Sequence, residues 1–288
     1  MKDITYAAPR TIAELTGLLN DKGDRARILA GGTDIIVQVR EGRRDIDALV
    51  DIKYIAEVNE LAFDAAKGLV IGAAVPCCLI YENKEIAKAY PGLMDAVSLI
   101  GGIQIQSRAS LGGNLCNASP AADGIPVLIA LQGMCDIAGA KGTRSVPIEQ
   151  FCTAPGKTVL QRGEFLVRFR FPPPKKHSGA AYLRFIPRNE MDIAVVGAGV
   201  WVQLDGAKCS AARIALAAVA PTPLLVSEAG TALVGTTLDD GALAKAASLA
   251  QAAAKPISDM RGDADYRRHL VGVLVKRALA IATDRARS

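Results

Sequence analysis

GGIQIQSRASLGGNLCNASPAAD, residues 101–123, is the stretch around which this chain is organised. The segment 103–111 indicates a short strand, and Gly112 and Gly113 follow it directly. Glycine tolerates a positive φ and lets another group approach the backbone closely. The sequence therefore predicts a turn at this point that can direct backbone amides towards an anion.

A helix start follows the glycine pair. Ser119 as N-cap and Pro120 at the first helical position precede an apolar run, 125–131, that ends near Gly133. Free N–H groups and the positive end of the helix dipole favour phosphate at such a terminus. The spacing is neither a Rossmann G-x-G-x-x-G motif nor a Walker A loop. A glycine turn that simply caps a core helix explains the same residues, so this pattern alone leaves both interpretations open.

The same arrangement occurs earlier in the chain. A predicted strand at 27–29 leads into AGGTD, residues 30–34, and Ile35, Ile36 and Val39 indicate a helix after it. One such loop is a weak signal, and an ordinary turn is the alternative. Two of them suggest that both loops close on one extended anionic ligand, such as a dinucleotide diphosphate.

Length and composition indicate an ordinary globular protein. The 288 residues are enough for one large domain or two to three small ones. Every long apolar stretch is interrupted before the roughly 18 residues that a membrane span needs. Residues 1–10 lack the apolar core of a secretory signal, so we expect a cytoplasmic protein without a membrane span.

The net charge of +5 raises nucleic acid as a partner. However, Lys and Arg are dispersed and aromatic residues make up only 5% of the chain, so we expect no nucleic-acid partner. The basic residues near the C-terminus are predicted to lie on a solvated helix face, or on a docking face for an acidic protein. They are Arg267, Arg268, Lys276 and Arg277.

The chain offers little for metal binding or acid–base catalysis. Its six cysteines, at positions 77, 78, 116, 135, 152 and 209, include no C-x-x-C pair, which is typical of a reduced compartment. His177 and His269 lie beside Lys176 and Arg268, which favours solvated positions over ligands or bases. We therefore predict no metal site and no catalytic side chain, and any redox chemistry would need an organic cofactor.

The remaining pattern predicts two α+β parts divided at the prolines 172–174. Before the prolines, we expect a helix capped by Thr11 and Glu14, a helix at 92–100, and strands at 48–52, 61–63, 69–74, 135–138, 144–146 and 165–171. After them, we expect strands at 180–186, 193–202 and 213–219, and helices from about 224, from about 240 and at 263–283.

Several of these stretches resemble the FAD-binding subunits and domains of the molybdenum hydroxylases, the xanthine dehydrogenase and carbon monoxide dehydrogenase family. The resemblance covers nearly the whole chain. Its segments are LAGGTDII from Leu29, IGGIQIQSRASLGGNLCNASPAAD from Ile100, RNEMDIAVVGA from Arg188, IALAAVAPTPL from Ile214 and SDMRGDADYRRHLVGVLVKRAL from Ser258.

The resemblance implies an α+β fold in two parts. Residues 1–174 would form a two-subdomain FAD-binding fold of the vanillyl-alcohol-oxidase/PCMH-like type, with the subdomains at roughly 1–53 and 54–174. Residues 175–288 would form the small α+β C-terminal domain of the same subunits, with about three strands and three helices.

The resemblance also implies where FAD binds. The loops 30–35 and 110–114 would carry its diphosphate on backbone amides, and Asn117 and Asp123 match positions that make polar contacts to the cofactor. Asp123 alternatively compensates the helix dipole from the fourth helical position. The implied cofactor-binding residues are Leu29, Ala30, Gly31, Gly32, Thr33, Asp34, Ile35, Ile100, Gly101, Ser110, Gly112, Gly113, Asn114, Asn117, Asp123, Leu166, Arg184, Asp192 and Ile193.

Three of these residues match positions that line the cofactor in the xanthine-oxidising members, namely Leu166, Arg184 and Ile193. A core leucine, a surface arginine and a buried strand residue are the alternatives. Arg184 stands where the family commonly has lysine, which keeps the charge but not the shape. The loop 30–34 has no histidine, so we expect FAD to be held without a covalent bond.

In function, the resemblance implies an electron-transfer subunit. A large subunit with the molybdenum cofactor would oxidise the substrate, and a small iron–sulfur subunit would pass electrons through FAD to an external acceptor, in a dimer of heterotrimers. The chain lacks the cysteine-rich insertion of the hydroxybenzoyl-coenzyme A reductases, which argues against that branch. A free-standing FAD oxidoreductase and a non-redox nucleotide-binding scaffold are the alternatives. This chain does not identify the substrate or the acceptor.

Overall fold

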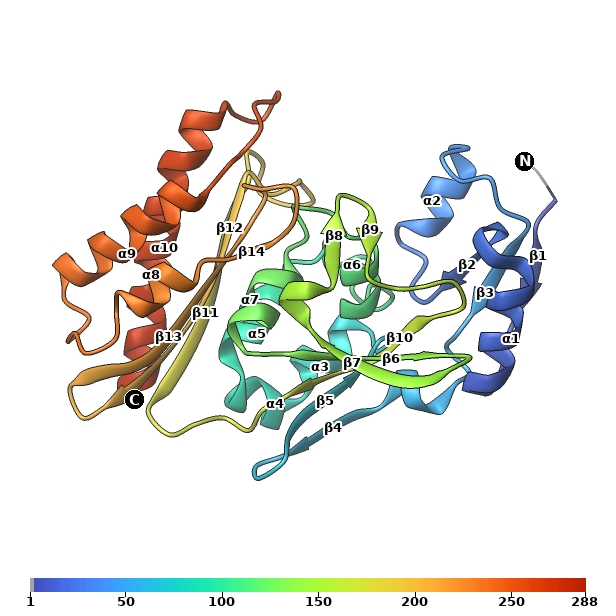
Figure 1. The fold of residues 1–288 in the computed structure, drawn as a ribbon, viewed down its shortest axis with the longest axis horizontal. Helices are drawn as coiled ribbons and strands as arrows, with labels where there is room; N and C mark the ends of the chain where they lie inside the picture. Colours follow the sequence, from blue (N-terminus) through green and yellow to red (C-terminus); the bar gives the residue numbers. More distant parts are fainter. Residues whose placement is uncertain (1–2) are drawn as a thin grey trace.

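A computed structural model describes residues 3–288, and its sheets follow one another along the long axis of the molecule (Figure 1). A three-stranded sheet has the order β1-β3-β2, a five-stranded sheet has the order β4-β5-β10-β6-β7, and a four-stranded sheet has the order β11-β12-β13-β14. The strands β8 and β9 form a separate two-stranded hairpin. The structure is therefore of the α+β class that the sequence predicts.

The first layer is a small parallel sheet with a helix packed on it. β1 and β2 both pair with β3 in parallel. Thr11 caps α1, because its Oγ1 accepts the amide of Glu14 at 3.1 Å, which confirms the predicted helix start. Its elements are β1 (Thr5–Ala7), α1 (Ile12–Lys22), β2 (Ala26–Leu29), α2 (Ile35–Arg40) and β3 (Ala48–Asp51).

The central layer is the antiparallel five-stranded sheet with short helices against it. Its strands are β4 (Leu61–Asp64), β5 (Gly68–Gly72), β6 (Met134–Gly139), β7 (Gly142–Pro147) and β10 (Phe165–Phe171), with β8 (Cys152–Ala154) and β9 (Lys157–Thr158) as the extra hairpin. Its helices are α3 (Cys77–Glu82), α4 (Lys84–Ala89), α5 (Pro91–Val97), α6 (Leu111–Cys116) and α7 (Gly124–Ala130).

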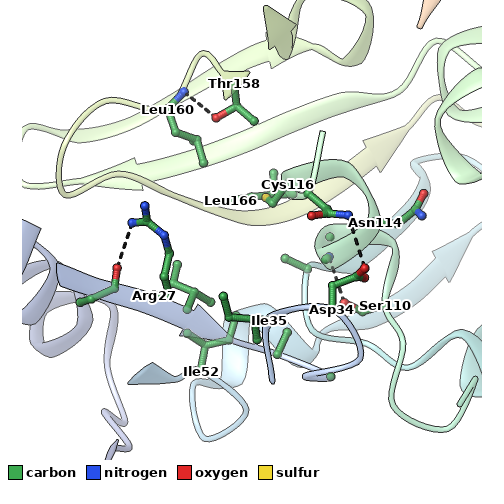
Figure 2. Close-up of a pocket in the computed structure, with 18 of the residues that line it drawn as sticks. Arg27, Asp34, Ile35, Ile52, Ser110, Asn114, Cys116, Thr158, Leu160 and Leu166 are labelled. Atoms are coloured by element: carbon green, nitrogen blue, oxygen red, sulfur yellow. Dashed lines mark hydrogen bonds between the residues drawn. The ribbon is translucent and has the colours of Figure 1, made fainter. Parts of the chain in front are cut away.

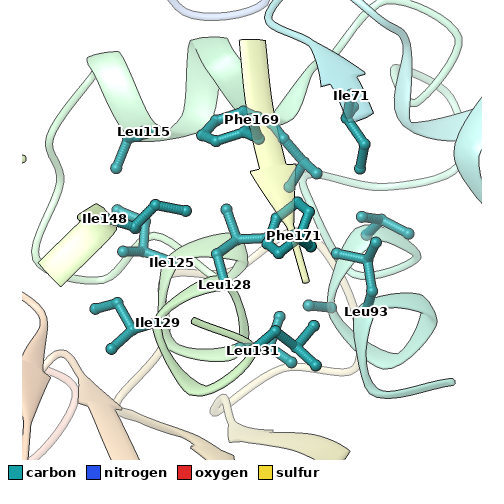
Figure 3. Close-up of a cluster of buried hydrophobic side chains, with 14 of the residues drawn as sticks. Ile71, Leu93, Leu115, Ile125, Leu128, Ile129, Leu131, Ile148, Phe169 and Phe171 are labelled. Atoms are coloured by element: carbon teal, nitrogen blue, oxygen red, sulfur yellow. The ribbon is translucent and has the colours of Figure 1, made fainter. Parts of the chain in front are cut away.

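Strand β10 supplies the centre of the largest core cluster. Alternate side chains of a strand share one face, so Phe169 and Phe171 both point to the same side of the sheet, with ring centroids 6.4 Å apart. Figure 3 shows Phe171 beside Leu128 of α7, with Ile125 and Ile148 in the same cluster. The second half of the alternating pattern therefore identifies the core against which α7 packs, whereas Phe165 and Val167 belong to the core of the first sheet.

The third layer is antiparallel and has helices on both faces. α10 packs on one face of the sheet, and α5 and α7 pack on β11 and β12 from the central layer. β12 is buried along nearly all its length, as predicted. The elements are β11 (Ser178–Phe185), β12 (Val196–Asp205), β13 (Lys208–Ala217), β14 (Leu224–Leu225), α8 (Ser227–Thr231), α9 (Asp240–Ala253) and α10 (Ala264–Arg287).

The predicted strand at 103–111 is wrong. Residues 103–108 form consecutive turns, and Ser110 makes only an isolated bridge to Pro76. Gly112 and Gly113 do not form a turn either, because they lie in the first turn of α6. Ser110 starts that helix by accepting the amide of Gly113 on its Oγ at 3.1 Å.

The predicted helix start at Ser119 and Pro120 is also wrong. Ser119 closes a local turn instead, with its Oγ accepting the amide of Ala121 at 3.3 Å. Helix α7 begins at Gly124, whose amide donates to Oδ1 of Asn114 at 3.1 Å. Asp123 is thus the N-cap residue and not the fourth residue of the helix, and its carboxylate makes no capping hydrogen bond.

The C-terminal part differs from prediction in three places. A helix was predicted from about residue 224, but Leu224 and Leu225 form the short strand β14 and α8 begins at Ser227. β12 begins at Val196, so Ile193 lies before the strand. Arg267 does not lie on a solvated face, since it is only 3% exposed and its guanidinium donates to Asp259 at 2.6 Å and to the carbonyl of Val195 at 2.8 Å. The spacing of residues along the predicted helix did not indicate that the Arg267 side chain is buried.

Candidate functional site

A cavity of about 550 Å³ lies between the first and central layers. Its walls come from β2 and the loop between β2 and α2, from α6, and from the segment after β9. Figure 2 shows Asp34 and Ile35 on one wall and Leu160 and Leu166 on another. The volume falls in the range of about 300–1,000 Å³ that is usual for small-molecule and cofactor sites.

The two glycine loops meet at this cavity. Gly31 lies directly against the chain that leads into α6, because a Cβ at Gly31 would be 1.9 Å from the carbonyl oxygen of Arg108. Only glycine permits so close an approach of two backbones. Gly31, Gly32, Gly112 and Gly113 all line the same cavity, which confirms the expected convergence of the two loops.

The loop 30–34 presents its backbone amides without protein partners. Gly32 has a φ of +82°, and the first helical bond of α2 runs from the amide of Ile36 to the carbonyl of Gly32. Within residues 3–288, the amides of residues 31–35 donate no hydrogen bond. A row of unpaired amides at a turn is an anion-binding arrangement, since each N–H can donate a charge-assisted hydrogen bond to a phosphate oxygen.

The two glycines of α6 have different roles. A Cβ at Gly112 would be 2.3 Å from the carbonyl oxygen of Ala73, so this glycine allows the helix to pack on the end of β5. A Cβ at Gly113 would have only Ser110 Oγ, at 3.3 Å, within 4 Å. Gly113 is also exposed and lines the cavity, which leaves room for a ligand to approach the backbone there.

Asn117 connects the two loops through its side-chain amide. Its Oδ1 accepts from Nε2 of Gln38 at 3.1 Å, and its Nδ2 donates to Oδ1 of Asp34 at 3.5 Å. Asn114 is engaged by the start of α7, as described above. Both asparagines line the cavity. Each also connects α6 to other elements, because Asn117 bonds it to the first glycine loop and to α2, and Asn114 bonds it to the start of α7.

Most of the residues singled out from the sequence lie together at the cavity, but six do not. Those lining it are Ala30, Gly31, Gly32, Thr33, Asp34, Ile35, Ile100, Ser110, Gly112, Gly113, Asn114, Asn117 and Leu166. Those outside its lining are Leu29, Gly101, Asp123, Arg184, Asp192 and Ile193.

Asp123 and Arg184 contact each other in the protein interior. Arg184 donates from Nη1 to Oδ2 of Asp123 at 2.6 Å, and Tyr182 donates from Oη to Oδ1 at 2.8 Å. The side chain of Arg184 is only 7% exposed, so the surface-arginine alternative is wrong. Burial raises the pKa of Asp123, which the Arg184 guanidinium opposes, and burial next to this carboxylate raises the pKa of Tyr182. The cluster ties β11 to the start of α7.

Of the other four residues outside the cavity, three have local structural roles and Ile193 is exposed. Leu29 is buried in the hydrophobic interior, and Gly101 adopts a φ of +65° at the start of the turns after Ile100. Asp192 pairs with Arg188 and Arg261 across two loops. Ile193 is 53% exposed, so the buried-strand alternative for it is wrong.

The sequence patterns did not indicate several cavity-lining residues. Arg27 extends from β2 into the cavity, with Leu160 on the opposite side (Figure 2). The segment after the β8-β9 hairpin closes that opposite side. It contains one glycine, Gly163, with a φ of +79°, but a single glycine does not separate it from an ordinary loop. The additional lining residues with polar side chains are Asp24, Arg27, Gln38, Arg44, Cys116, Thr158, Gln161, Arg162 and Glu164.

The lining of the cavity is suited to binding an anionic ligand. Within residues 3–288, no group of three or more His, Cys, Asp or Glu side chains could hold a metal ion. None of the helices in this part of the chain combines the length and apolar character that crossing a bilayer requires. Unpaired amides and close-packed glycines make the site fit an extended phosphate-containing ligand.

Two family models match the chain. The model described as the FAD binding domain in molybdopterin dehydrogenase matches residues 2–174. The model described as the CO dehydrogenase flavoprotein C-terminal domain matches residues 181–282. Between them, the two matches cover nearly the whole chain.

Individual relatives and solved structures agree with these models. The chain is 32% identical over 283 residues to the xanthine dehydrogenase FAD-binding subunit of Escherichia coli O157:H7, over 98% of this chain and 97% of the relative. It is 34% identical over 283 residues to the carbon monoxide dehydrogenase medium chain of Afipia carboxidovorans, over 98% of each chain. A chain of the Cu,Mo-CO dehydrogenase crystal structure in the cyanide-inactivated form matches with a TM-score of 0.94 and 33% identity over 99% of both chains. A chain of quinoline 2-oxidoreductase from Pseudomonas putida 86 matches with a TM-score of 0.91 and 30% identity over 100% of both chains.

Proposed function

The chain belongs to the FAD-binding subunits of the molybdenum hydroxylase family, and from this premise we propose that it binds FAD non-covalently and transfers electrons through it. FAD supplies chemistry that exchanges electrons one or two at a time. The observation that carries the proposal is the row of unpaired amides at residues 31–35, which faces the same cavity as the start of α6. The protein contributes position and electrostatics to this chemistry.

We assign the diphosphate of FAD to the two glycine loops. The amides of residues 31–35 would bind its oxygens on one side, and the open backbone at Gly113 would admit it on the other. Asn117 would keep the loops at a fixed separation through Asp34 and Gln38. The assignment of all nineteen residues named above to the cofactor is part of this proposal, and for the six outside the cavity it rests on the family resemblance alone.

We propose partners and a location on the same basis. Related chains are named the medium chain of carbon monoxide dehydrogenase and the FAD-binding subunit of xanthine dehydrogenase. By analogy, a large subunit with the molybdenum cofactor and a small iron–sulfur subunit would assemble with this chain as a dimer of heterotrimers. Electrons would leave FAD for an external acceptor. The six free cysteines support a cytoplasmic location, where thiols stay reduced.

The division of the chain at the prolines 172–174 is also a proposal. The residues before it would form the FAD-binding domain, with subdomains at roughly 1–53 and 54–174, and residues 175–288 would form the C-terminal domain. The centres of the core clusters support this division, since one lies on the central sheet, one on the first sheet and one on the C-terminal sheet with α9 and α10. The clusters also cross it, because Tyr182 and Trp201 pack in the central cluster and Phe165 and Val167 pack in the cluster of the first sheet.

Reconstitution of the purified full-length chain with FAD tests the proposed function. We expect the protein to retain flavin absorption after gel filtration, and no retained flavin would contradict the proposal. Purification of the tagged chain from its native host separates the alternatives, since a free-standing oxidoreductase would carry no iron–sulfur subunit and no molybdenum. Reduction of the bound flavin when the substrate of the complex is added would exclude a non-redox scaffold.

Gly113→Ala should weaken FAD binding about tenfold or more while the fold stays intact. The added methyl group has no backbone clash, but it occupies the space through which the ligand approaches the helix start. Losing one charge-assisted bond costs about 1.5–3 kcal/mol, which corresponds to a tenfold or greater change in Kd. Titration of the apo-protein with FAD, followed by flavin fluorescence, gives the affinity, and thermal unfolding reports the fold.

Gly17→Ala is the matched control for this substitution. Gly17 lies in α1, and a Cβ there would have nothing within 4 Å. Alanine is a better helix former than glycine by up to about 1 kcal/mol, so this variant should be slightly stabilised and should bind FAD normally. Equal FAD affinity in the Gly113→Ala and Gly17→Ala proteins would show that the diphosphate does not approach Gly113.

A further inference from the structure

Lys53 is bonded to the first glycine loop from outside the cavity. Its Nζ donates to the carbonyl oxygen of Ala30 at 2.9 Å and to Oδ1 of Asp51 at 2.7 Å. Lys53 itself is not part of the cavity lining, although its neighbour Ile52 is. The ammonium group therefore contacts the back of the loop and not the space for a ligand.

Asp51 fixes the position of this ammonium group. Asp51 is 4% exposed, and besides Lys53 it accepts a hydrogen bond on Oδ2 from the hydroxyl of Tyr6 at 2.8 Å. Burial works to raise the pKa of Asp51, but the bonds from Lys53 and Tyr6 lower it below its ordinary value. The hydrogen bond that Tyr6 donates to Asp51 raises the pKa of Tyr6 to about 12. Asp51 is thus a carboxylate with firm partners on both oxygens, and Lys53 has little freedom to leave it.

The bond from Lys53 sets the direction of the next amide. The peptide between Ala30 and Gly31 is trans, so its carbonyl oxygen and its N–H point in opposite directions. With the Ala30 oxygen held by Lys53, the N–H of Gly31 must point away from Lys53. Gly31 cannot shift to compensate, because its Cα lies against the carbonyl of Arg108. The first of the five unpaired amides is therefore held in place before any ligand arrives.

We propose that Lys53, supported by Asp51 and Tyr6, is a positioning residue that holds the loop 30–34 in its anion-binding conformation. The inference rests on the proposed function, because it assigns the diphosphate part of FAD as the group that benefits. Lys53 acts through the backbone of Ala30 and touches no part of the ligand. A preorganised loop binds more tightly, since less ordering entropy is lost on binding.

Lys53→Met tests this role, with Lys53→Arg as the conservative variant and Lys67→Met as the matched control. Lys67 lies in the turn between β4 and β5, outside the cavity lining. We expect Lys53→Met to weaken the binding of FAD and of ADP by the same factor, about tenfold. Riboflavin has no phosphate and should bind as it does to the wild-type protein. Lys53→Arg should recover most of the affinity, and Tyr6→Phe should show a smaller loss.

A second measurement does not depend on FAD. In the apo-protein, hydrogen exchange of the amides of Ile36 and Gln38, which donate to the loop carbonyls of Gly32 and Asp34, should be faster in Lys53→Met than in the wild-type and Lys67→Met proteins. Unchanged exchange together with unchanged ADP affinity would overturn the inference. Equal losses for ADP and riboflavin would also overturn it, because they would indicate a general structural defect. If the wild-type protein bound neither FAD nor ADP, the proposed function would fail, and the exchange measurement would still decide whether Lys53 orders the loop.

Discussion

Gly31→Ala is expected to yield a folded C-terminal part and a protein that no longer retains FAD. The new Cβ would lie 1.9 Å from the carbonyl oxygen of Arg108, so the loop 30–34 and the chain entering α6 must move apart. Two or more of the charge-assisted bonds to a diphosphate would then be lost. At about 1.5–3 kcal/mol each, their loss weakens binding by more than about a hundredfold.

Flavin content after reconstitution and gel filtration measures this effect, and circular dichroism with thermal unfolding reports the fold. Overpacking in a close-packed region also costs about 1–3 kcal/mol, so a lower melting temperature is expected as well. Gly17→Ala serves again as the control, because it adds the same methyl group in open space. A Gly31→Ala protein that retained stoichiometric FAD would show that the contact between the two loops is unnecessary for binding.

The contact at Gly31 illustrates what the sequence could predict and what it could not. The repeated glycine pairs were enough to predict that the two loops meet at one place, and both line the same cavity, although the strand predicted before the second pair is wrong. The identity of the backbone atoms that meet at Gly31 depends on Arg108, which is distant in sequence and carries no glycine or capping signature. A local sequence pattern can thus predict that a loop needs glycine, but it cannot predict which backbone atoms of a distant segment pack against that glycine.

Helix starts show the same limit. Thr11 and Glu14 form a local cap, and the structure confirms the helix that they predict. Ser119 and Pro120 have an equally favourable local pattern, yet α7 begins later because Asn114 accepts the amide of Gly124. The competing cap comes from ten residues upstream, and tertiary packing overrides the local preference.

Burial of charge was the least predictable property. Arg267 was expected on a solvated or docking helix face, and a surface position was the alternative to the cofactor role of Arg184. Both arginines are buried, Arg184 against a carboxylate and Arg267 against a carboxylate and carbonyl groups. Long charged side chains are rarely buried without a partner, so their burial depends on partners far along the chain. Asp123 is the partner of Arg184, and the family resemblance had indicated it only as a cofactor contact.

The buried ion pair between Asp123 and Arg184 leads to a prediction about the stability of the protein. Asp123→Ala should lower the free energy of unfolding of the apo-protein by about 3–5 kcal/mol, because it leaves a guanidinium group unpaired in the interior. The hydroxyl of Tyr182 would lose its acceptor in the same variant. Denaturant unfolding of the FAD-free protein measures the change without any contribution from the ligand.

The double variant Asp123→Ala, Arg184→Met decides whether this loss comes from the stranded charge. Replacing both members of a buried ion pair with apolar residues is often close to neutral, so the double variant should recover much of the stability that Asp123→Ala loses. Arg188→Met is the matched control, since Arg188 also pairs with an aspartate but its side chain is 69% exposed. Exposed pairs contribute about 0–1 kcal/mol, so this control should change little. A double variant as unstable as Asp123→Ala would mean that the carboxylate stabilises the start of α7 by itself, independently of Arg184.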